Sequence, residues 1–446
     1  MAREISKRAS IPTRLIGILL LLGLSSCGIG FSLRHSGASS QAAFARPLFL
    51  PPRGSISENE IAILVNDNDS QSVAVANYYQ SRRAIPPANV VHLNFPAGVS
   101  TLTSAQFLPL KAKVDAALGP LIQALVITWT QPYLVQCMSI TSAFTLGFDL
   151  KYCNTTGGTC GTTAQSPYYN QESTAPFTDL GIRPAMMLAG ASISDVEVLI
   201  ERGILATGTL IHGNGYFIRT SDSARSVRYP EFQNLVQSWD PSTTGDDLIY
   251  VDNSAGTGSD VISGKPDVLF YFTGLPTVPS ITTNLFAPGA VADHLTSFGG
   301  QVPTSSQMSA LAWLQAGATG SYGTVVEPCA YPQKFPDPSI LVPFYFRGNS
   351  LVEAYWKSVA WPGEGLFIGD PLARPYAKSL VTYPSGAMEI QTSWLKPGVA
   401  YRLVAADETD AVYWSTIETD IVAPKLQMTR LVVLQPEHAY YRLVTP

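Results

Sequence analysis

The stretch Ile-Ala-Ile-Leu-Val at 61–65, followed by Asn-Asp-Asn-Asp-Ser at 66–70, indicates the fold class of this chain. A short, uninterrupted apolar run is typical of a strand buried on both faces of a parallel sheet. Residues 72–83 then carry apolar side chains at helical spacing, and the prolines at 86 and 87 end the predicted helix. A buried strand that leads through a polar turn into a helix is the opening of a βαβ unit.

The same alternation continues downstream. Strands are predicted at 90–95, 124–129, 208–217 (interrupted at His212), 268–273 and 318–326, and helices at 104–118, 192–202, 308–316 and 351–359. We therefore predict an α/β fold over residues 55–383, with a mostly parallel sheet and helices on both of its faces. Beyond residue 383 the apolar runs become short and alternating, with turn residues between them, which predicts a small antiparallel β-domain at 384–446.

Composition narrows the class of partner. The chain has 446 residues, of which 46% are hydrophobic and 14% charged, and its net charge is −5. A chain of this kind can bury a large core, and its acidic balance argues against a nucleic-acid partner. Because the chain has only five histidines and lacks H-E-x-x-H and C-x-x-C, we expect no metal site. The sequence also lacks a P-loop and a Gly-rich dinucleotide fingerprint. Whether the protein binds a cofactor is unknown from the sequence.

The N-terminus has the pattern of an export signal. Basic residues precede an apolar run at 15–24, which is too short for the roughly twenty residues of a membrane-spanning helix. Leu24-Ser25-Ser26-Cys27 resembles a bacterial lipobox, so we expect a signal peptide at 1–26, a lipidated Cys27 and a flexible tether at 27–54. Cleavage after Ala43-Phe44-Ala45 and an uncleaved anchor are the alternatives. The expected location is the cell envelope, as a periplasmic or outer-membrane lipoprotein, and otherwise the medium.

Four cysteines remain after Cys27, and an exported protein can oxidise them. Cys153 and Cys160 flank a turn-rich segment, so we expect a local disulfide there, which leaves Cys137 to pair with Cys329. The alternatives are that Cys329 is an inert free thiol, or that it is a free nucleophile with His294 or His212 as its base.

Polar residues that follow the predicted strands are the candidate ligand-binding residues, since ligands of parallel α/β sheets bind beyond the carboxyl ends of the strands. They are Asn66, Asp67, Asp69, Gln131 and His212. The two aspartates also suit a hard cation, but capping of the following helix explains them too, and the segment does not match an EF-hand loop.

The candidate catalytic residues are Cys329, His294 and Glu327. Cys329 and His294 would act as nucleophile and base, and Glu327 as a general acid or base. An ion pair of Glu327 with Arg347 or Lys334 is the structural alternative. No G-x-S-x-G nucleophile elbow is present in the sequence.

Several motifs together resemble an uncharacterised family of exported bacterial proteins. They are Val-Asn-Asp-Asn-Asp-Ser at 65–70, Pro-Gly-Ala-Val-Ala-Asp-His-Leu-Thr-Ser at 288–297, Gly-Thr-Val-Val-Glu-Pro at 323–328 and Gly-Asp-Pro-Leu at 369–372. That family occurs in genomes that carry exosortase, a protein-sorting membrane transpeptidase, and has no established activity. The resemblance spans about residues 60–376 and implies an exported location and a genome that carries exosortase.

A second resemblance is to the gingipain and caspase type of cysteine peptidase. The opening strand–helix unit and the Gly369-Asp370-Pro371 motif are similar, and they imply a caspase-like layout. The catalytic pair does not transfer, because Thr273-Gly274-Leu275-Pro276 follows the first candidate strand without a histidine.

Two functions follow from these observations. The first is a binding or accessory role in the envelope of an exosortase-bearing bacterium, with an envelope polymer or an exported protein as partner and the membrane reached through the lipid anchor. The second is a caspase-like or gingipain-like cysteine hydrolase or transacylase. A reactive Cys329 beside a histidine would favour the enzyme, and a disulfide at Cys329 would count against it.

Overall fold

The computed structural model describes residues 46–51, 54–153 and 161–445. The predicted signal peptide, the lipidation site Cys27, most of the tether and Cys160 lie outside the described residues. In the described ranges no helix has both the length and the apolar character needed to cross a membrane.

Ten strands of the described chain form one large sheet in the order β10-β9-β11-β12-β13-β14-β8-β5-β2-β3. Neighbouring strands are parallel except for β13 and β14, which are antiparallel. The predicted α/β class with a mostly parallel sheet is confirmed. The strands are β2 (Ile61–Asn66), β3 (Val90–Leu93), β5 (Ala124–Ile127), β8 (Ala185–Met187), β9 (Asn214–Arg219), β10 (Leu248–Asp252), β11 (Val268–Gly274), β12 (Phe286–Leu295), β13 (Gly320–Thr324) and β14 (Gly365–Gly369).

The strand order reverses twice. In the part β3-β2-β5-β8 the first strand along the chain, β2, lies between the second and the third, and β9 takes the same place in β10-β9-β11-β12-β13. The sheet therefore has two topological switch points, one between β2 and β5 and one between β9 and β11. In parallel α/β sheets ligands bind beyond the carboxyl ends of the strands at such points.

The opening strand and helix form as predicted. All six residues of β2 are buried, and α1 (Ser70–Arg83) begins where the Asp69 side chain accepts a hydrogen bond from the Gln71 backbone N–H. The far end of α1 is held by the buried Asp370, whose carboxylate accepts from the Tyr79 hydroxyl at 3.0 Å and pairs with the Arg83 guanidinium. The motif at 369–371 thus anchors the first helix.

One helix–strand boundary differs from the prediction. Helix α5 (Ile193–Gly208) extends beyond the predicted end at 202, and β9 begins only at Asn214. The segment predicted as an interrupted strand at 208–217 therefore contains a helix end, a connection and only the first part of a strand. The other helices are α2 (Ser104–Ala117), α3 (Ile140–Leu146), α4 (Pro176–Leu180), α6 (Tyr229–Ser238), α7 (Pro241–Thr244), α8 (Leu311–Ala316), α9 (Pro338–Phe346) and α10 (Leu351–Ser358).

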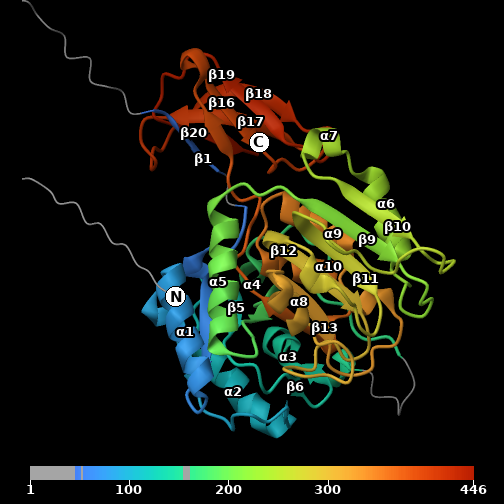
Figure 1. The fold of residues 1–446 in the computed structure, drawn as a ribbon. Coiled ribbons are helices and arrows are strands. Elements are labelled where there is room, and N and C mark those ends of the chain that lie inside the picture. Colours follow the sequence, from blue (N-terminus) through green and yellow to red (C-terminus); the bar gives the residue numbers. More distant parts are fainter. Residues whose placement is uncertain (1–45, 52–53, 154–160, 446) are drawn as a thin grey trace, which may run out of the picture. The chain divides into compact units, whose positions relative to one another are not determined.

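The C-terminal residues form two small sheets (Figure 1). One is antiparallel and contains β15 (Leu380–Thr382), β16 (Met388–Thr392) and β19 (Thr429–Val433). In the other, β17 (Ala400–Ala406), β18 (Ser415–Val422) and β20 (Tyr440–Val444) are antiparallel, and β1 (Leu48–Leu50) joins β20 in parallel. Part of the predicted tether is therefore a strand. A short third sheet contains β4 (Thr101–Leu102), β6 (Leu134–Val135) and β7 (Met138–Ser139).

Candidate functional site

The loop after β2 is held by hydrogen bonds of its own. Asn66 is buried, and its side-chain oxygen accepts from the backbone N–H groups of Asn68 and Phe95. Asp69 caps α1, and the Asp67 carboxylate lies 2.7 Å from Nδ1 of the exposed His92. The two aspartates thus bind different partners, and their carboxylates do not point to a common ligand site. No cluster of three or more His, Cys, Asp or Glu residues that could hold a metal ion occurs in the described part of the chain.

Other loops that follow strands are also closed by contacts within the protein. Gln131 donates from its amide to the Val302 carbonyl at 3.2 Å. At the second switch point, the Thr220 hydroxyl contacts the Ser226 hydroxyl and the Gly274 carbonyl, each at 2.7 Å. The carboxyl edge between β9 and β11 is therefore filled by its own loops.

His294 lies in the core. Its Nδ1 accepts from the Trp313 indole N–H at 2.9 Å, and its Nε2 donates to the Met308 carbonyl at 3.1 Å. Burial lowers the pKa of His294 to about 3, so the imidazole is neutral. Its neighbour Asp293 is buried against Arg228 at 2.6 Å, and burial raises the pKa of Asp293. Since both nitrogens of His294 are engaged, this residue is not placed to act as a base.

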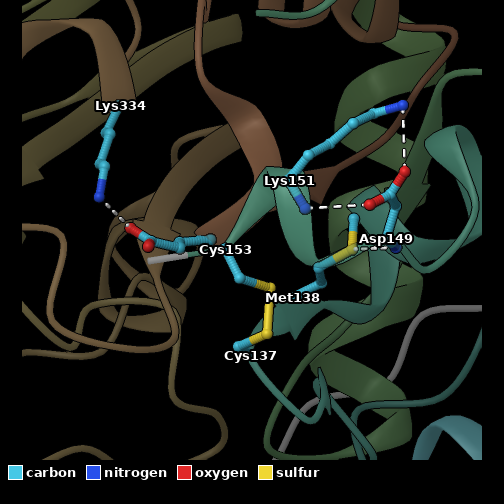
Figure 2. Close-up of a disulfide and its surroundings, with 7 residues drawn as sticks. Cys137, Met138, Asp149, Lys151, Cys153 and Lys334 are labelled. Atoms are coloured by element: carbon cyan, nitrogen blue, oxygen red, sulfur yellow. Dashed lines mark hydrogen bonds and ion pairs between the residues drawn. A yellow bond between two sulfur atoms is a disulfide. The ribbon is translucent and has the colours of Figure 1, made fainter. Parts of the chain in front are cut away.

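The cysteines pair differently from the prediction. Cys137 is bonded to Cys153, with their Cα atoms 5.7 Å apart (Figure 2). Cys329 is also disulfide-bonded. The expected pairs Cys153–Cys160 and Cys137–Cys329 are therefore wrong, because the turn between β6 and β7 brings Cys137 beside Cys153 although 16 positions separate them.

Glu327 is exposed and accepts a hydrogen bond from the backbone N–H of Cys329 at 2.8 Å. The ion pairs expected for Glu327 are not the ones formed. Lys334 lies 2.8 Å from Glu364 in the core, and Arg347 lies 3.0 Å from Glu172. The structure thus does not bring Cys329, His294 and Glu327 together as a catalytic group.

His212 lies at the amino end of β9, because that strand begins at Asn214. It is therefore at the edge of the sheet opposite to the one predicted. Its Nδ1 lies 2.9 Å from the carboxylate of Asp246, which is fully buried, while the His212 side chain is 40% exposed. That hydrogen bond raises the pKa of His212. The same carboxylate accepts from the Gly213 backbone N–H at 2.9 Å and from the Tyr376 hydroxyl at 2.6 Å.

A cavity of about 1010 Å³ opens at this imidazole, and we refer to it as the His212 cavity. Its wall is formed by β1, the end of α5, α7 and the segment 377–383, together with Gln391 and Met428. The apolar side chains in the wall are Leu48, Phe49, Pro51, Leu210, Ala377, Leu380, Val381 and Met428, and the polar ones include His212, Ser242, Thr243, Thr244, Lys378, Ser379 and Tyr383. Met428 is tied to this wall by a backbone hydrogen bond of 2.8 Å to the Thr243 carbonyl.

The sequence indicated His212 as a candidate residue but not Asp246 and Tyr376, which lie beside it in the fold. Asp246 is 34 positions away from His212 along the chain, and Tyr376 is 130 positions away from Asp246. Neither residue lies in a recognisable motif, so no local pattern indicated that they converge. The apolar wall was missed for the same reason, since its residues come from segments far apart in the chain, around positions 50, 210, 380 and 428.

Comparisons with known proteins place few constraints on function. No family model matches the chain, and no curated protein matches it. One solved structure, described as "Structure of Protease", aligns with 88% of this chain and 98% of its own at 9% identity and a TM-score of 0.39. A similarity of this size carries no argument about activity. The resemblance to an exosortase-associated family remains a prediction.

Proposed function

We propose that this protein is an exported cell-envelope protein that binds a ligand in the His212 cavity and has an accessory role there. The observation that carries the proposal is an apolar cavity of about 1010 Å³ with an oriented imidazole in its wall. Ligand sites are typically concave and mostly apolar, with a small number of placed polar groups and a perturbed titratable residue.

The cysteine-enzyme alternative has less support. Cys329 is disulfide-bonded, and a nucleophile must be a thiolate. His294 has both ring nitrogens engaged in the core, and His212 is at the opposite edge of the sheet from the loop that carries Cys329. The alternative therefore lacks a thiol–imidazole pair within the described residues.

The location in the cell envelope is part of the proposal. It rests on the signal-like sequence at 1–26 and the lipobox-like Leu24-Ser25-Ser26-Cys27, and the Cys137–Cys153 disulfide suits an oxidising compartment. The partner class is an envelope polymer or an exported protein. Fractionation of cells that express the wild type and Cys27→Ser tests the address: we expect the wild type in the membrane fraction and the variant released from it. Equal fractionation of both proteins would contradict a lipid anchor at Cys27.

Binding in the cavity is tested with N-phenyl-1-naphthylamine, a neutral fluorophore whose emission rises in apolar surroundings. Thr209 is exposed and lines the cavity, so Thr209→Trp fills the opening without disturbing the core. Thr101→Trp is the matched control, since Thr101 is an exposed strand residue that does not line the cavity. We expect saturable binding by the wild type and the control, and at least about tenfold weaker binding by Thr209→Trp. Absence of saturable binding, or an equal loss in both variants, would overturn the proposal.

A further inference from the structure

The His212 cavity is basic in a protein that is acidic as a whole. The titratable side chains in its described wall are His212, Lys378 and Tyr383, and no described aspartate or glutamate lines it. The whole chain, in contrast, has a net charge of −5. A cavity wall that carries basic side chains and no carboxylate of its own favours anions, and the Asp246 carboxylate behind the His212 ring offsets part of that attraction.

The imidazole is oriented for a ligand. Asp246 engages Nδ1, so Nε2 is the ring nitrogen left to a molecule in the cavity. The groups packed against the ring are the Asp246 carboxylate, the Tyr376 ring at a centroid distance of 6.4 Å, and Gly245. Gly245 has a φ of +88°, and a Cβ there would lie 3.0 Å from Cε1 of His212, so glycine permits this close approach. The imidazole is therefore held in one orientation by backbone and side chain together.

The wall of the His212 cavity combines basic and apolar side chains. Lys378 lies in the segment that also contributes Leu380, and its ammonium donates to the Gly208 carbonyl at 3.1 Å. The Arg46 guanidinium lies 5.4 Å from the centroid of the Tyr383 ring, which adds positive charge beside another part of the wall. Apolar side chains from β1 and β15 and Met428 cover much of the remaining surface.

From this arrangement we infer that the ligand of the His212 cavity is an amphiphile: a carboxylate or phosphate head group held by His212 and Lys378, and an apolar body that packs along Leu48, Leu380 and Met428. This inference rests on the proposed function, because it names the ligand class of the same cavity. Charge-assisted hydrogen bonds between a cationic donor and an anionic oxygen are about twice as strong as neutral ones, so the head group would supply selectivity and the apolar body would supply burial.

The pH dependence of binding follows from the Asp246 hydrogen bond. That bond raises the pKa of His212, so the imidazole keeps its proton to a higher pH than a free histidine. Binding of the anion should weaken as the pH rises through this raised pKa. Lys378 is a second basic side chain in the wall, so part of the preference for anions should remain.

The test is displacement of N-phenyl-1-naphthylamine from the full-length protein by decanoate, decyl phosphate and decanol, which share one apolar chain. At pH 5.5 we expect at least one anion to displace the fluorophore about tenfold more tightly than decanol, and the tighter of the two identifies the head group. The difference between decanoate and decanol should shrink at pH 8.5, because decanoate carries one charge at both pH values while His212 loses its proton; decyl phosphate gains a second charge over this range and is compared with decanol at pH 5.5 only. His212→Gln should remove most of the preference at pH 5.5 and keep the affinity for decanol.

His92→Gln is the matched control. His92 is also an exposed histidine beside an aspartate, at 2.7 Å from Asp67, and it does not line the cavity. We expect this variant to keep the preference for anions. Equal displacement by all three compounds, or an unchanged preference in His212→Gln, would overturn the inference and leave the binding function standing. Failure of the fluorophore to bind would overturn both.

Discussion

Asp246 is the residue whose loss should most disturb the His212 cavity. Its buried carboxylate accepts three hydrogen bonds, from His212, the Gly213 backbone N–H and the Tyr376 hydroxyl. Asp246→Ala removes the acceptor of all three hydrogen bonds and leaves two buried donors, at Gly213 and Tyr376, without a partner. His212 is 40% exposed and can turn to water, so it adds little to the cost.

The expected loss follows from these two donors. A buried polar group that loses its partner costs about 1–3 kcal/mol, so Asp246→Ala should lower the free energy of unfolding by about 2–6 kcal/mol. His212→Gln should cost less than about 1 kcal/mol, because it removes a half-exposed partner. Adding Tyr376→Phe to Asp246→Ala should cost less than Tyr376→Phe alone, since the hydroxyl has already lost its acceptor.

Urea unfolding followed by tryptophan fluorescence measures these differences. Trp239 donates from its indole to the Asp246 backbone carbonyl, so it reports on this part of the protein. The reasoning would be refuted if Asp246→Ala cost less than about 1 kcal/mol, or if His212→Gln cost as much as Asp246→Ala. Additive costs for Asp246→Ala and Tyr376→Phe would show that the two side chains do not share one hydrogen bond.

Three further changes test the core. The pKa of His294 is about 3 in the folded protein and about 6.5 in the unfolded chain, so below about pH 6.5 only the unfolded chain binds this proton. The free energy of unfolding should therefore drop by up to about 1.4 kcal/mol for each pH unit below that value. His294→Gln should flatten this slope, measured by urea unfolding at pH 7 and pH 4. Replacing both Cys137 and Cys153 with serine opens a link between residues 16 positions apart and should cost about 3 kcal/mol; an unchanged unfolding midpoint would argue against the bond. In Gly203→Ala the new Cβ would lie 2.0 Å from Oδ2 of Asp370, so the loss should be about 1–3 kcal/mol or more, seen as a lower Tm; an unchanged Tm would show that Asp370 can move.

Local pattern determined much of the large sheet. The run at 61–65 became β2, the spacing at 72–83 became α1, and the apolar run at 268–273 became most of β11. These elements were predictable because a strand buried on both faces needs a continuous apolar run, and a packed helix needs apolar side chains every three to four residues. Asp69 followed the capping rule for the same local reason.

Contacts between distant segments could be read only from the tertiary structure. The cysteine pairing depended on the position of the β6–β7 turn. His212 lies at the amino end of β9 and not at the predicted carboxyl end, because α5 continues to Gly208 and β9 begins only at Asn214. Asp246 reaches His212 and Tyr376 across long stretches of chain, and no local pattern encodes such a meeting. Sequence by itself determined the fold class and much of the opening of the sheet, because hydrophobic periodicity acts over a few residues. Tertiary structure decided the candidate site, because a buried carboxylate takes its hydrogen-bond donors from whichever segments the folded core brings to it.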